Sequence, residues 1–282
     1  MAPYDSRVGW KIEDAGSVDN CFELLAPSVG TQSVRLFHGA RRDYGRIVST
    51  LDIWAENNSG KEAVAAERHF LESFGRDAWL HLDESSRIVI QLAREKWRTL
   101  SNTGTMFVGR HYGLPVRCVD WTSHPWISLF FACRMGFNDA AVVWWMDNSE
   151  FEGWVAKQWQ KAFGVDRGVE DKIEAAFISG EHHEWITGLH YPPIMQRPTE
   201  QKACVTIAGR VGIQHDERIS SLGLRKCGRV RIPAGLKKGV LQRLDELGVN
   251  GRSLAMGFSH VEDLAHEVAE SLKGGEGHST FP

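Results

Sequence analysis

The chain has 282 residues, of which 42% are hydrophobic and 24% are charged, as in ordinary globular proteins. This composition excludes a largely disordered chain and a collagen-like one. With 33 Lys and Arg against 36 Asp and Glu, the net charge is -3. Such a balance argues against a protein that holds nucleic acid by bulk charge alone.

The charge is unevenly distributed along the chain. Residues 205–252 carry 10 Lys or Arg against 4 Asp or Glu, whereas residues 133–200 carry 6 against 11. Two interpretations of the basic region 205–252 stay open. It is either a solvated surface whose charges pair within the molecule, or a face that binds an anion or a nucleic acid.

Targeting and cysteine signals favour a reduced, cytoplasmic protein. No segment reaches the roughly 18 apolar residues of a membrane helix, and the N-terminus lacks the apolar run of a signal peptide. The five cysteines include no Cys-x-x-Cys pair, which predicts reduced core thiols and no structural zinc. His182-His183-Glu184 is a weak metal candidate, because neighbours on a helix point about 100° apart; a surface loop is favoured, and we expect no metal.

Periodicity and end signals predict helices and strands mixed along the chain. The predicted elements are a strand over 34–37 that stops at His38-Gly39, helices over 60–80 and 86–100, a helix opened by Pro125, a strand over 140–146, strands over 203–208 and 229–232, and helices over 237–247 and 261–272. No repeat or long linker separates them. We therefore expect one α+β domain over residues 1–273, followed by a disordered tail over 274–282.

The segment 109–133, GRHYGLPVRCVDWTSHPWISLFFAC, combines polar and titratable side chains between apolar elements. Ligands usually bind in such segments. An equally open interpretation is a structural turn in which Asp120 caps backbone amides and Trp121 fills the core. The sequence holds no GxxxxGK[ST], GxSxG or HExxH motif and no GxGxxG after a strand.

Residues 109–132 of this segment resemble the signature of the FRG domain family, which is named for a Phe-Arg-Gly motif near its start. Phe37-His38-Gly39 occupies the place of that motif. Weaker matches follow at Glu67 to Phe74, at Tyr191 to Gln201 and over 231–254, so that the resemblance spans about residues 34 to 270. The chain departs from the family pattern at His38, over 203–205 and over 256–258.

The departure at His38 points to a second, more distant resemblance. Leu36-Phe37-His38-Gly39 is similar to the opening strand of the poly(ADP-ribose) polymerase group, whose His-Gly holds NAD. This resemblance implies an ADP-ribosyltransferase-like α+β fold of two small packed β-sheets that form an NAD cleft, flanked by helices. By order and residue type, Trp121-Thr122-Ser123 takes the place of the second motif and Glu200-Gln201 that of the third.

The same resemblance implies roles for individual residues. Those expected to bind NAD are His38 at a ribose hydroxyl, Gly39 at the nicotinamide amide, Tyr112 or Trp121 by stacking, Arg117 at the pyrophosphate, and Asp120, Thr122 and Ser123 around them. Cleavage of the nicotinamide bond develops a cation on the ribose, which a carboxylate stabilises. Glu200, with Gln201 beside it, is the expected catalytic carboxylate. Asp120 is its rival, and it equally suits a salt bridge with Arg117.

The resemblance thus predicts an NAD-dependent mono-ADP-ribosyltransferase of a toxin–antitoxin or phage-defence system. NAD is expected as substrate, an RNA or DNA base as acceptor through the region 205–252, and an antitoxin protein as a further partner, with no membrane. Three alternatives stay open: an NAD glycohydrolase, a protein-directed transferase, and a nucleotide-binding module without turnover.

Overall fold

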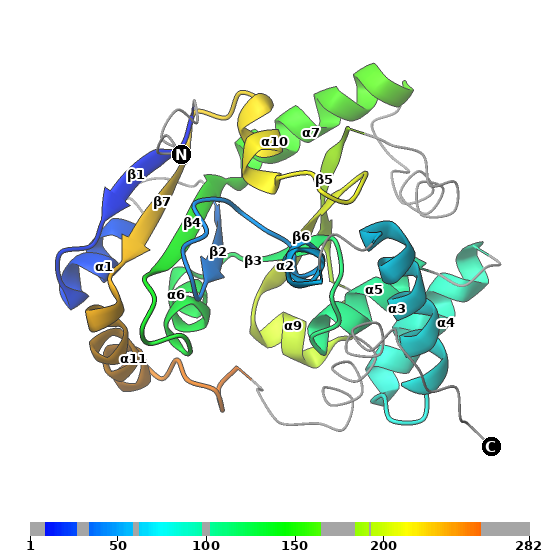
Figure 1. The fold of residues 1–282 in the computed structure, drawn as a ribbon, viewed down its shortest axis with the longest axis horizontal. Coiled ribbons are helices and arrows are strands. Elements are labelled where there is room, and N and C mark those ends of the chain that lie inside the picture. The colour runs from blue at the N-terminus through cyan, green and yellow to red at the C-terminus, as the bar shows by residue number, and fades with distance from the viewer. Residues whose placement is uncertain are drawn as a thin grey trace.

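The computed structural model describes residues 9–26, 34–58, 62–97, 102–164, 184–191 and 193–254. Seven strands form one mixed sheet, in the spatial order β1-β7-β4-β2-β3-β6-β5 (Figure 1). The strands are β1 (Lys11–Asp14), β2 (Arg35–Ala40), β3 (Cys118–Thr122), β4 (Ala141–Asp147), β5 (Ile186–His190), β6 (Ala203–Ala208) and β7 (Cys227–Ile232). β1 and β7 pair in parallel, and every other neighbouring pair is antiparallel.

Ten α-helices surround this sheet in the described part of the chain. They are α1 (Val18–Leu25), α2 (Thr50–Asn57), α3 (Ala63–Asp77), α4 (Glu84–Trp97), α5 (Asn102–His111), α6 (Pro125–Cys133), α7 (Asn148–Phe163), α9 (Gln196–Glu200), α10 (His215–Ser221) and α11 (Lys237–Glu246). The predicted α+β class is therefore correct. The predicted helix over 261–272, the tail over 274–282 and the pair His182-His183 lie outside the described residues.

A single sheet stands where two packed sheets were expected, so the described residues do not show the expected cleft between two sheets. The reason lies in β2, which pairs with β4 over six residues, from Arg35 opposite Asp147 to Ala40 opposite Val142. On its other edge β2 pairs with β3 at one position, Phe37 opposite Thr122. That pairing joins β1-β7-β4-β2 to β3-β6-β5 and makes the sheet continuous. Beyond it β2 and β3 have no further paired residues, and we call this region the β2–β3 fork.

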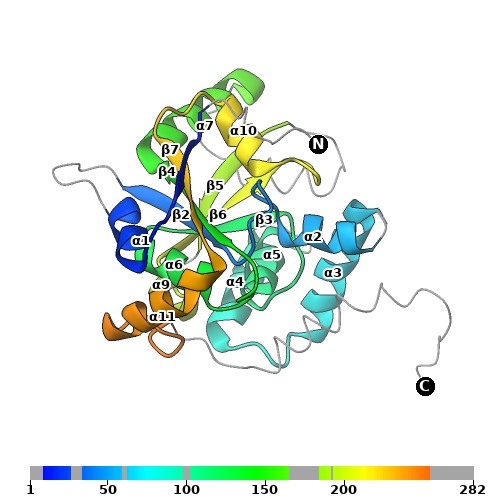
Figure 2. The same ribbon diagram turned by 60° about the vertical axis from the view of Figure 1, so that its left-hand side comes forward.

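Three apolar clusters fill the space between the sheet and the helices. Phe37 and Val143 face α1, α6 and α11 on one side of the sheet, where Figure 2 shows these helices together. On the opposite face, Leu36 and Trp144 pack with residues of α7 and α10. The third cluster lies between β3 and β6 and the helices α3, α4 and α5. Strand alternation explains this division, because successive residues of β2 point to opposite faces.

Most predicted elements fall close to the observed ones, but β2 does not stop at His38-Gly39. The strand continues to Ala40, so that His38 and Gly39 are paired with Trp144 and Val143 of β4. Gly39 is required there by packing. A Cβ atom at residue 39 would lie 2.0 Å from the Ser128 carbonyl oxygen of α6, which is far inside the contact distance of two atoms.

A buried lysine fixes the loops beside this helix. Lys237, at the start of α11, donates from Nζ to the carbonyl oxygens of Arg41, Met135 and Gly136 at 2.7, 3.0 and 2.7 Å. Burial lowers the pKa of Lys237, but three carbonyl acceptors compensate the ammonium for the loss of water. The side chain thereby ties the loop after β2 to the loop after α6.

The five cysteines are unpaired and buried, as the sequence predicts. Burial raises the pKa of the Cys133 and Cys204 thiols to about 12, so both are protonated at neutral pH. Among the described residues, no helix combines the length and apolar character needed to cross a membrane.

The packing at Gly39 gives a stability prediction with a matched control. Gly39→Ala should lower the free energy of unfolding by about 2–4 kcal/mol, because α6 must move away from β2. Gly153→Ala, inside α7 with no atom within 4 Å of the added carbon, should instead raise it by about 0.5–1 kcal/mol. Urea denaturation of both variants measures the two changes. Equal stability of Gly39→Ala and the parent protein would contradict the packing argument.

Candidate functional site

Four elements bring polar side chains together around Asp120 at the β2–β3 fork. Asp120 Oδ2 lies 2.5 Å from the Nη2 of Arg110, the penultimate residue of α5. Tyr191, directly after β5, donates from its hydroxyl to Asp120 Oδ1 at 2.9 Å. His38 of β2 contacts the carbonyl oxygen of Asp120 through Nδ1 at 2.7 Å. The Asp120 side chain is 39% exposed, so this cluster is reachable from solvent.

The hydrogen bond of His38 defines its tautomer. A carbonyl oxygen can only accept, so Nδ1 must carry the proton, which leaves Nε2 as an acceptor. Nε2 has no hydrogen-bond partner among the described residues. Burial lowers the pKa of His38 below 6.5, although the bond to Asp120 and the charge of Asp120 act in the opposite direction. His38 is therefore a neutral histidine with one acceptor nitrogen to offer.

Arg110 and Tyr191 are held in fixed protonation states by the same cluster. Burial by itself lowers the pKa of Arg110, but the charge of Asp120 and its hydrogen bond, together with Cys118 and Tyr191, more than offset this and raise it. Burial and the charge of Asp120 raise the pKa of Tyr191 well above 10, so its hydroxyl stays a donor. The Nε–H of Arg110 is buried and has no acceptor within the described part of the chain. One donor of the cluster is thus unused.

Arg117 does not face Asp120. Its guanidinium pairs with Glu67 of α3, with Nε and Nη2 at 2.6 and 2.5 Å from Oε2, and its backbone N–H donates to Oε1 at 2.8 Å. Both side chains are buried. Because Glu67 already accepts from the Nε and Nη2 donors of Arg117, the geometry gives no support for the predicted contact of Arg117 with a pyrophosphate. The salt bridge between Arg117 and Asp120 that the sequence allowed is not formed either.

Trp121 is a core residue. It is 1% exposed, and its Nε1 donates to Thr206 Oγ1 at 2.9 Å. Thr206 in turn contacts Nδ1 of His215 at 2.9 Å, and Nε2 of His215 lies 3.1 Å from the Arg117 carbonyl oxygen. A buried indole in this chain of hydrogen bonds cannot stack on a ligand without leaving its place, so the expected stacking by Trp121 is not supported.

Tyr112 likewise lies away from His38. Its hydroxyl donates to Asp83 at 2.6 Å, and its ring lies against His111 with the ring centres 5.2 Å apart. Its described contacts are with the α3–α5 side of the molecule, so stacking by Tyr112 also has no support from the geometry. The space around Gly39 is filled by α6, as described above, and the expected role of its backbone stays a prediction.

The second and third predicted motifs meet at the closed end of the fork. Thr122 Oγ1 donates to the Gln201 carbonyl oxygen at 2.7 Å, and the Ser123 N–H donates to Lys202 O at 3.2 Å. Lys202 has a φ of 47°, a backbone conformation that residues other than glycine rarely adopt and that often marks functional turns. These bonds place the second predicted motif beside Gln201 and Lys202, while the roles of both motifs stay predictions.

The two residues of the third motif have different surroundings. Glu200, the last residue of α9, is exposed and has no hydrogen-bond or ion-pair partner among the described residues. The Gln201 side chain donates from Nε2 to Leu254 O at 3.1 Å, which ties it to the C-terminal side of the chain. Asp120, in contrast to Glu200, is held on both oxygens.

Sequence reasoning missed Arg110, Tyr191, Glu67 and His215 as members of these networks. Arg110 stands inside the segment 109–133 that the sequence singled out, and Tyr191 opens the weaker match from Tyr191 to Gln201. From the sequence, no helix is predicted over 102–111. Such a helix would have placed Arg110 near the start of β3. His215 carries no local signal, since its partners are more than eight residues away.

A cavity of about 200 Å³ lies between α7 and the strands β5 and β6. Its walls include Leu36, Cys204 and Thr206, and Leu36 lies on the same face of β2 as His38. This volume is smaller than the about 300–1,000 Å³ typical of ligand sites, and it suits one ring rather than a whole dinucleotide. No group of three His, Cys, Asp or Glu side chains arranged for a metal occurs among the described residues.

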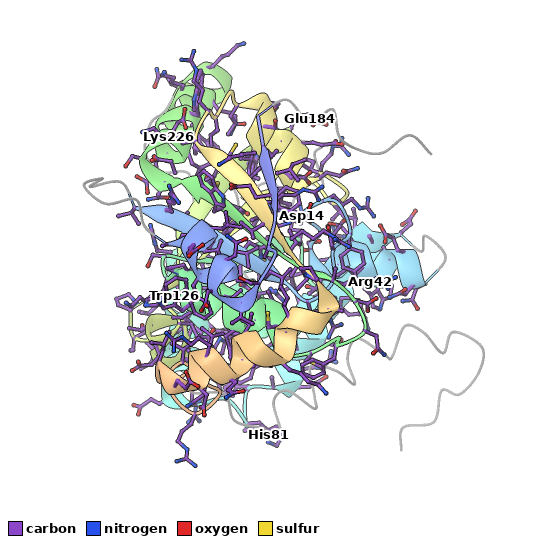
Figure 3. The ribbon with its side chains drawn as sticks, turned by 90° about the vertical axis from the view of Figure 1, so that its left-hand side faces the viewer. Asp14, Arg42, His81, Trp126, Glu184 and Lys226 are labelled. Carbon is purple, nitrogen blue, oxygen red and sulfur yellow. The ribbon has the colours of Figure 1, made fainter. Side chains whose placement is uncertain are left out.

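Most described cations of the region 205–252 are engaged within the molecule. Arg210 pairs with Glu184, Arg229 and Arg231 with Asp43, and Arg243 with Glu246, while Lys237 is buried. Lys226, at the outer edge in Figure 3, is 70% exposed and lies 4.0 Å from Asp147. These contacts favour the interpretation of pairing within the molecule. A nucleic-acid partner of this region stays a prediction.

The buried pair of Glu67 and Arg117 gives a prediction about stability. Glu67→Leu leaves a buried guanidinium without its carboxylate and should lower the free energy of unfolding by about 3–5 kcal/mol. The double variant Glu67→Leu/Arg117→Leu removes both charges and should recover at least half of that loss. Urea denaturation of the two single variants and the double variant forms the thermodynamic cycle. Strictly additive losses would show that the two side chains do not interact.

The buried side chain of His215 gives a prediction about how the stability of the protein depends on pH. Burial lowers the pKa of His215 from 6.5 to about 4, so the unfolded chain binds a proton at higher pH than the folded one does. Stability should therefore fall as the pH drops below about 6.5, by a total of about 3 kcal/mol from this residue once the pH is below 4. His215→Asn should flatten the dependence between pH 6.5 and 4, measured by thermal unfolding. An unchanged slope would assign it to other groups.

Comparison with known proteins gives one match, to a family model that covers part of the chain. Residues 34–140 match the model of the FRG domain family. This segment begins at β2 and includes His38, Arg110, Arg117 and Asp120, but it ends before Glu200 and Gln201. No curated protein and no solved structure matches the chain. The similarity to ADP-ribosyltransferases therefore stays a prediction, whereas the match over 34–140 supports the FRG family for this chain.

Proposed function

We propose that the protein is an NAD-dependent mono-ADP-ribosyltransferase whose reaction centre lies at the β2–β3 fork. The observation that carries the proposal is His38. It is neutral, it is fixed by the Asp120 carbonyl oxygen, and its Nε2 is an acceptor without a partner in the described part of the chain. A ribose hydroxyl is a donor that fits this nitrogen.

The cluster beside His38 supports a ligand at the same place. The Nε–H of Arg110 is a buried donor without an acceptor among the described residues, which is uncommon in folded proteins. An oxygen of a bound nucleotide would satisfy it. The ion pair with Asp120 fixes the guanidinium, so that this donor is held in one position before the ligand arrives.

The proposed reaction breaks the bond between nicotinamide and ribose, and the ribose carbon becomes electron-poor as the bond lengthens. Glu200 is the proposed carboxylate that stabilises this charge and takes the proton of the acceptor. It lies on the turn that Thr122 and Ser123 hold at the closed end of the fork. Asp120 acts as the residue that orients Arg110, because both of its oxygens are already engaged.

The acceptor and the biological setting are proposed from the resemblance to the FRG family. The proposed acceptor is an RNA or DNA base, and the proposed setting is a toxin or phage-defence system. Five cations over 205–252 lie within 4.0 Å of carboxylates of the same molecule, which lowers the positive charge that this region offers to a nucleic acid. The acceptor is therefore best identified by experiment, with water and protein as the other outcomes.

Labelled NAD tests the transferase. The protein is incubated with NAD labelled in the adenosine part and with RNA, DNA and protein, and the label in each fraction is measured. His38→Ala and Glu200→Gln should each lower transfer by about 10²–10⁴-fold. His81→Ala changes an exposed histidine that points away from the sheet in Figure 3, and it should leave the activity unchanged.

Three results would contradict parts of the proposal. Release of free ADP-ribose with no labelled acceptor would identify a glycohydrolase. Full activity of folded Glu200→Gln together with loss of activity in Asp120→Asn would move the catalytic role to Asp120. If no fraction is labelled and calorimetry detects no binding of NAD, the protein is not this enzyme.

A further inference from the structure

A larger cavity lies apart from the fork cluster, between α2, the first turn of α3 and two loops. Its volume is about 570 Å³, within the range of about 300–1,000 Å³ that is typical of binding sites. The loops are residues 46–48, which follow β2, and residues 211–214, which follow β6. Figures 1 and 2 both show α2 beside α3 in this part of the molecule.

The cavity has an apolar interior and a charged rim. Ile47 is 1% exposed, and Ala55, Ala63 and Val211 are half-buried. The rim carries Glu56 and Glu62, which are both exposed. Val64 also lies at the rim and is 41% exposed, a large apolar side chain with much of its surface in water. An occupant that covers Val64 and fills the interior would remove this apolar surface from water.

The charges around the cavity favour a cationic occupant. Among the described residues of the lining, Arg46 is the one basic side chain, and Glu56 already pairs with it. Asp52 is engaged by the backbone N–H and hydroxyl of Ser49 in the capping box of α2. Glu62 remains. It stands at the N-cap of α3 but makes no capping bond, and it has no ion-pair partner among the described residues.

The start of α3 does not reverse this balance. A helix N-terminus contributes about half a positive charge, and Glu62 at the N-cap more than compensates it. With three carboxylates and one guanidinium among the described lining residues, the cavity would repel a pyrophosphate or a nucleic-acid backbone. This site therefore differs in chemistry from the nucleotide site proposed at the fork.

We infer that this cavity docks a segment of a partner protein in which an apolar side chain stands next to Lys or Arg. The apolar side chain enters the interior between Ala55 and Val211. The adjacent cation lies against Glu62 at the rim. A peptide is favoured over a small cation because the apolar surface continues out to Val64, where a neighbouring residue of the same segment would cover it. The inference does not depend on ADP-ribosyl transfer.

The loop that lines this cavity continues from β2, the strand that carries His38 at the fork. Residues 41–49 leave β2 directly after Ala40, and Ile47 packs in the same apolar cluster as Trp121. The Ile47 N–H donates to Asp216 Oδ1 of α10 at 2.9 Å. A docked segment would contact the loop that continues the strand of His38.

A pair of synthetic peptides tests the inference. One carries Leu and Phe between Arg residues, and its counterpart has Glu in place of each Arg. Fluorescence anisotropy with the full chain should show binding of the basic peptide and none of the acidic one. Glu62→Lys should raise the dissociation constant for the basic peptide about tenfold, and added salt should weaken the binding. Val64→Ser, which removes apolar surface without adding a charge, should weaken it as well.

Glu72→Lys is the matched control, because Glu72 is an exposed residue of the same helix outside the cavity. It should leave the dissociation constant unchanged. The inference is overturned if the basic peptide fails to bind at about 1 mM, if Glu72→Lys weakens binding as much as Glu62→Lys, if the acidic peptide binds equally well, or if an RNA oligonucleotide competes for the site. Circular dichroism of each variant confirms that it is folded.

Discussion

The hydrogen bond between His38 and the Asp120 carbonyl oxygen spans the place where the sheet opens. β2 and β3 share one paired position, Phe37 with Thr122, and then lose their register. The imidazole of His38 replaces backbone pairing over the next residues and keeps the two strands at a fixed separation. A backbone ladder would satisfy the same groups but would leave no acceptor facing outward. The His38 ring satisfies Asp120 and keeps one nitrogen available.

The position of β3 in turn rests on buried polar networks. Glu67 fixes Arg117 from one side of the strand, while His215 and Thr206 fix Trp121 from the other. Each network is expensive to bury and each is satisfied in the described structure, so a displaced β3 would leave several charged or polar groups without partners. This explains why a strand with an arginine, an aspartate and a threonine at or beside it can lie inside the molecule. Its polar residues either join a network or line the fork.

Local sequence signals predicted many elements correctly. Pro125 in a first helical turn predicts α6, and the apolar runs over 140–146 and 203–208 predict β4 and β6 within a residue. The same rules failed over 102–111, where Thr and Gly obscure the helix α5, and over 118–122, where polar residues suggested a turn. In both places tertiary contacts compensate for weak local preference. Arg110 and Asp120, one from each segment, stabilise each other.

The sequence by itself determined the α+β class, the burial of the cysteines as free thiols and the resemblance of residues 109–132 to the FRG signature. These follow from composition, periodicity and short motifs, which depend on neighbours along the chain. The tertiary structure alone decided that one continuous sheet forms, that Arg117 pairs with Glu67 and that Arg110, Tyr191 and His38 converge on Asp120. Those partners are far apart in sequence, and a side chain's partner is set by which surfaces the folded core brings into contact.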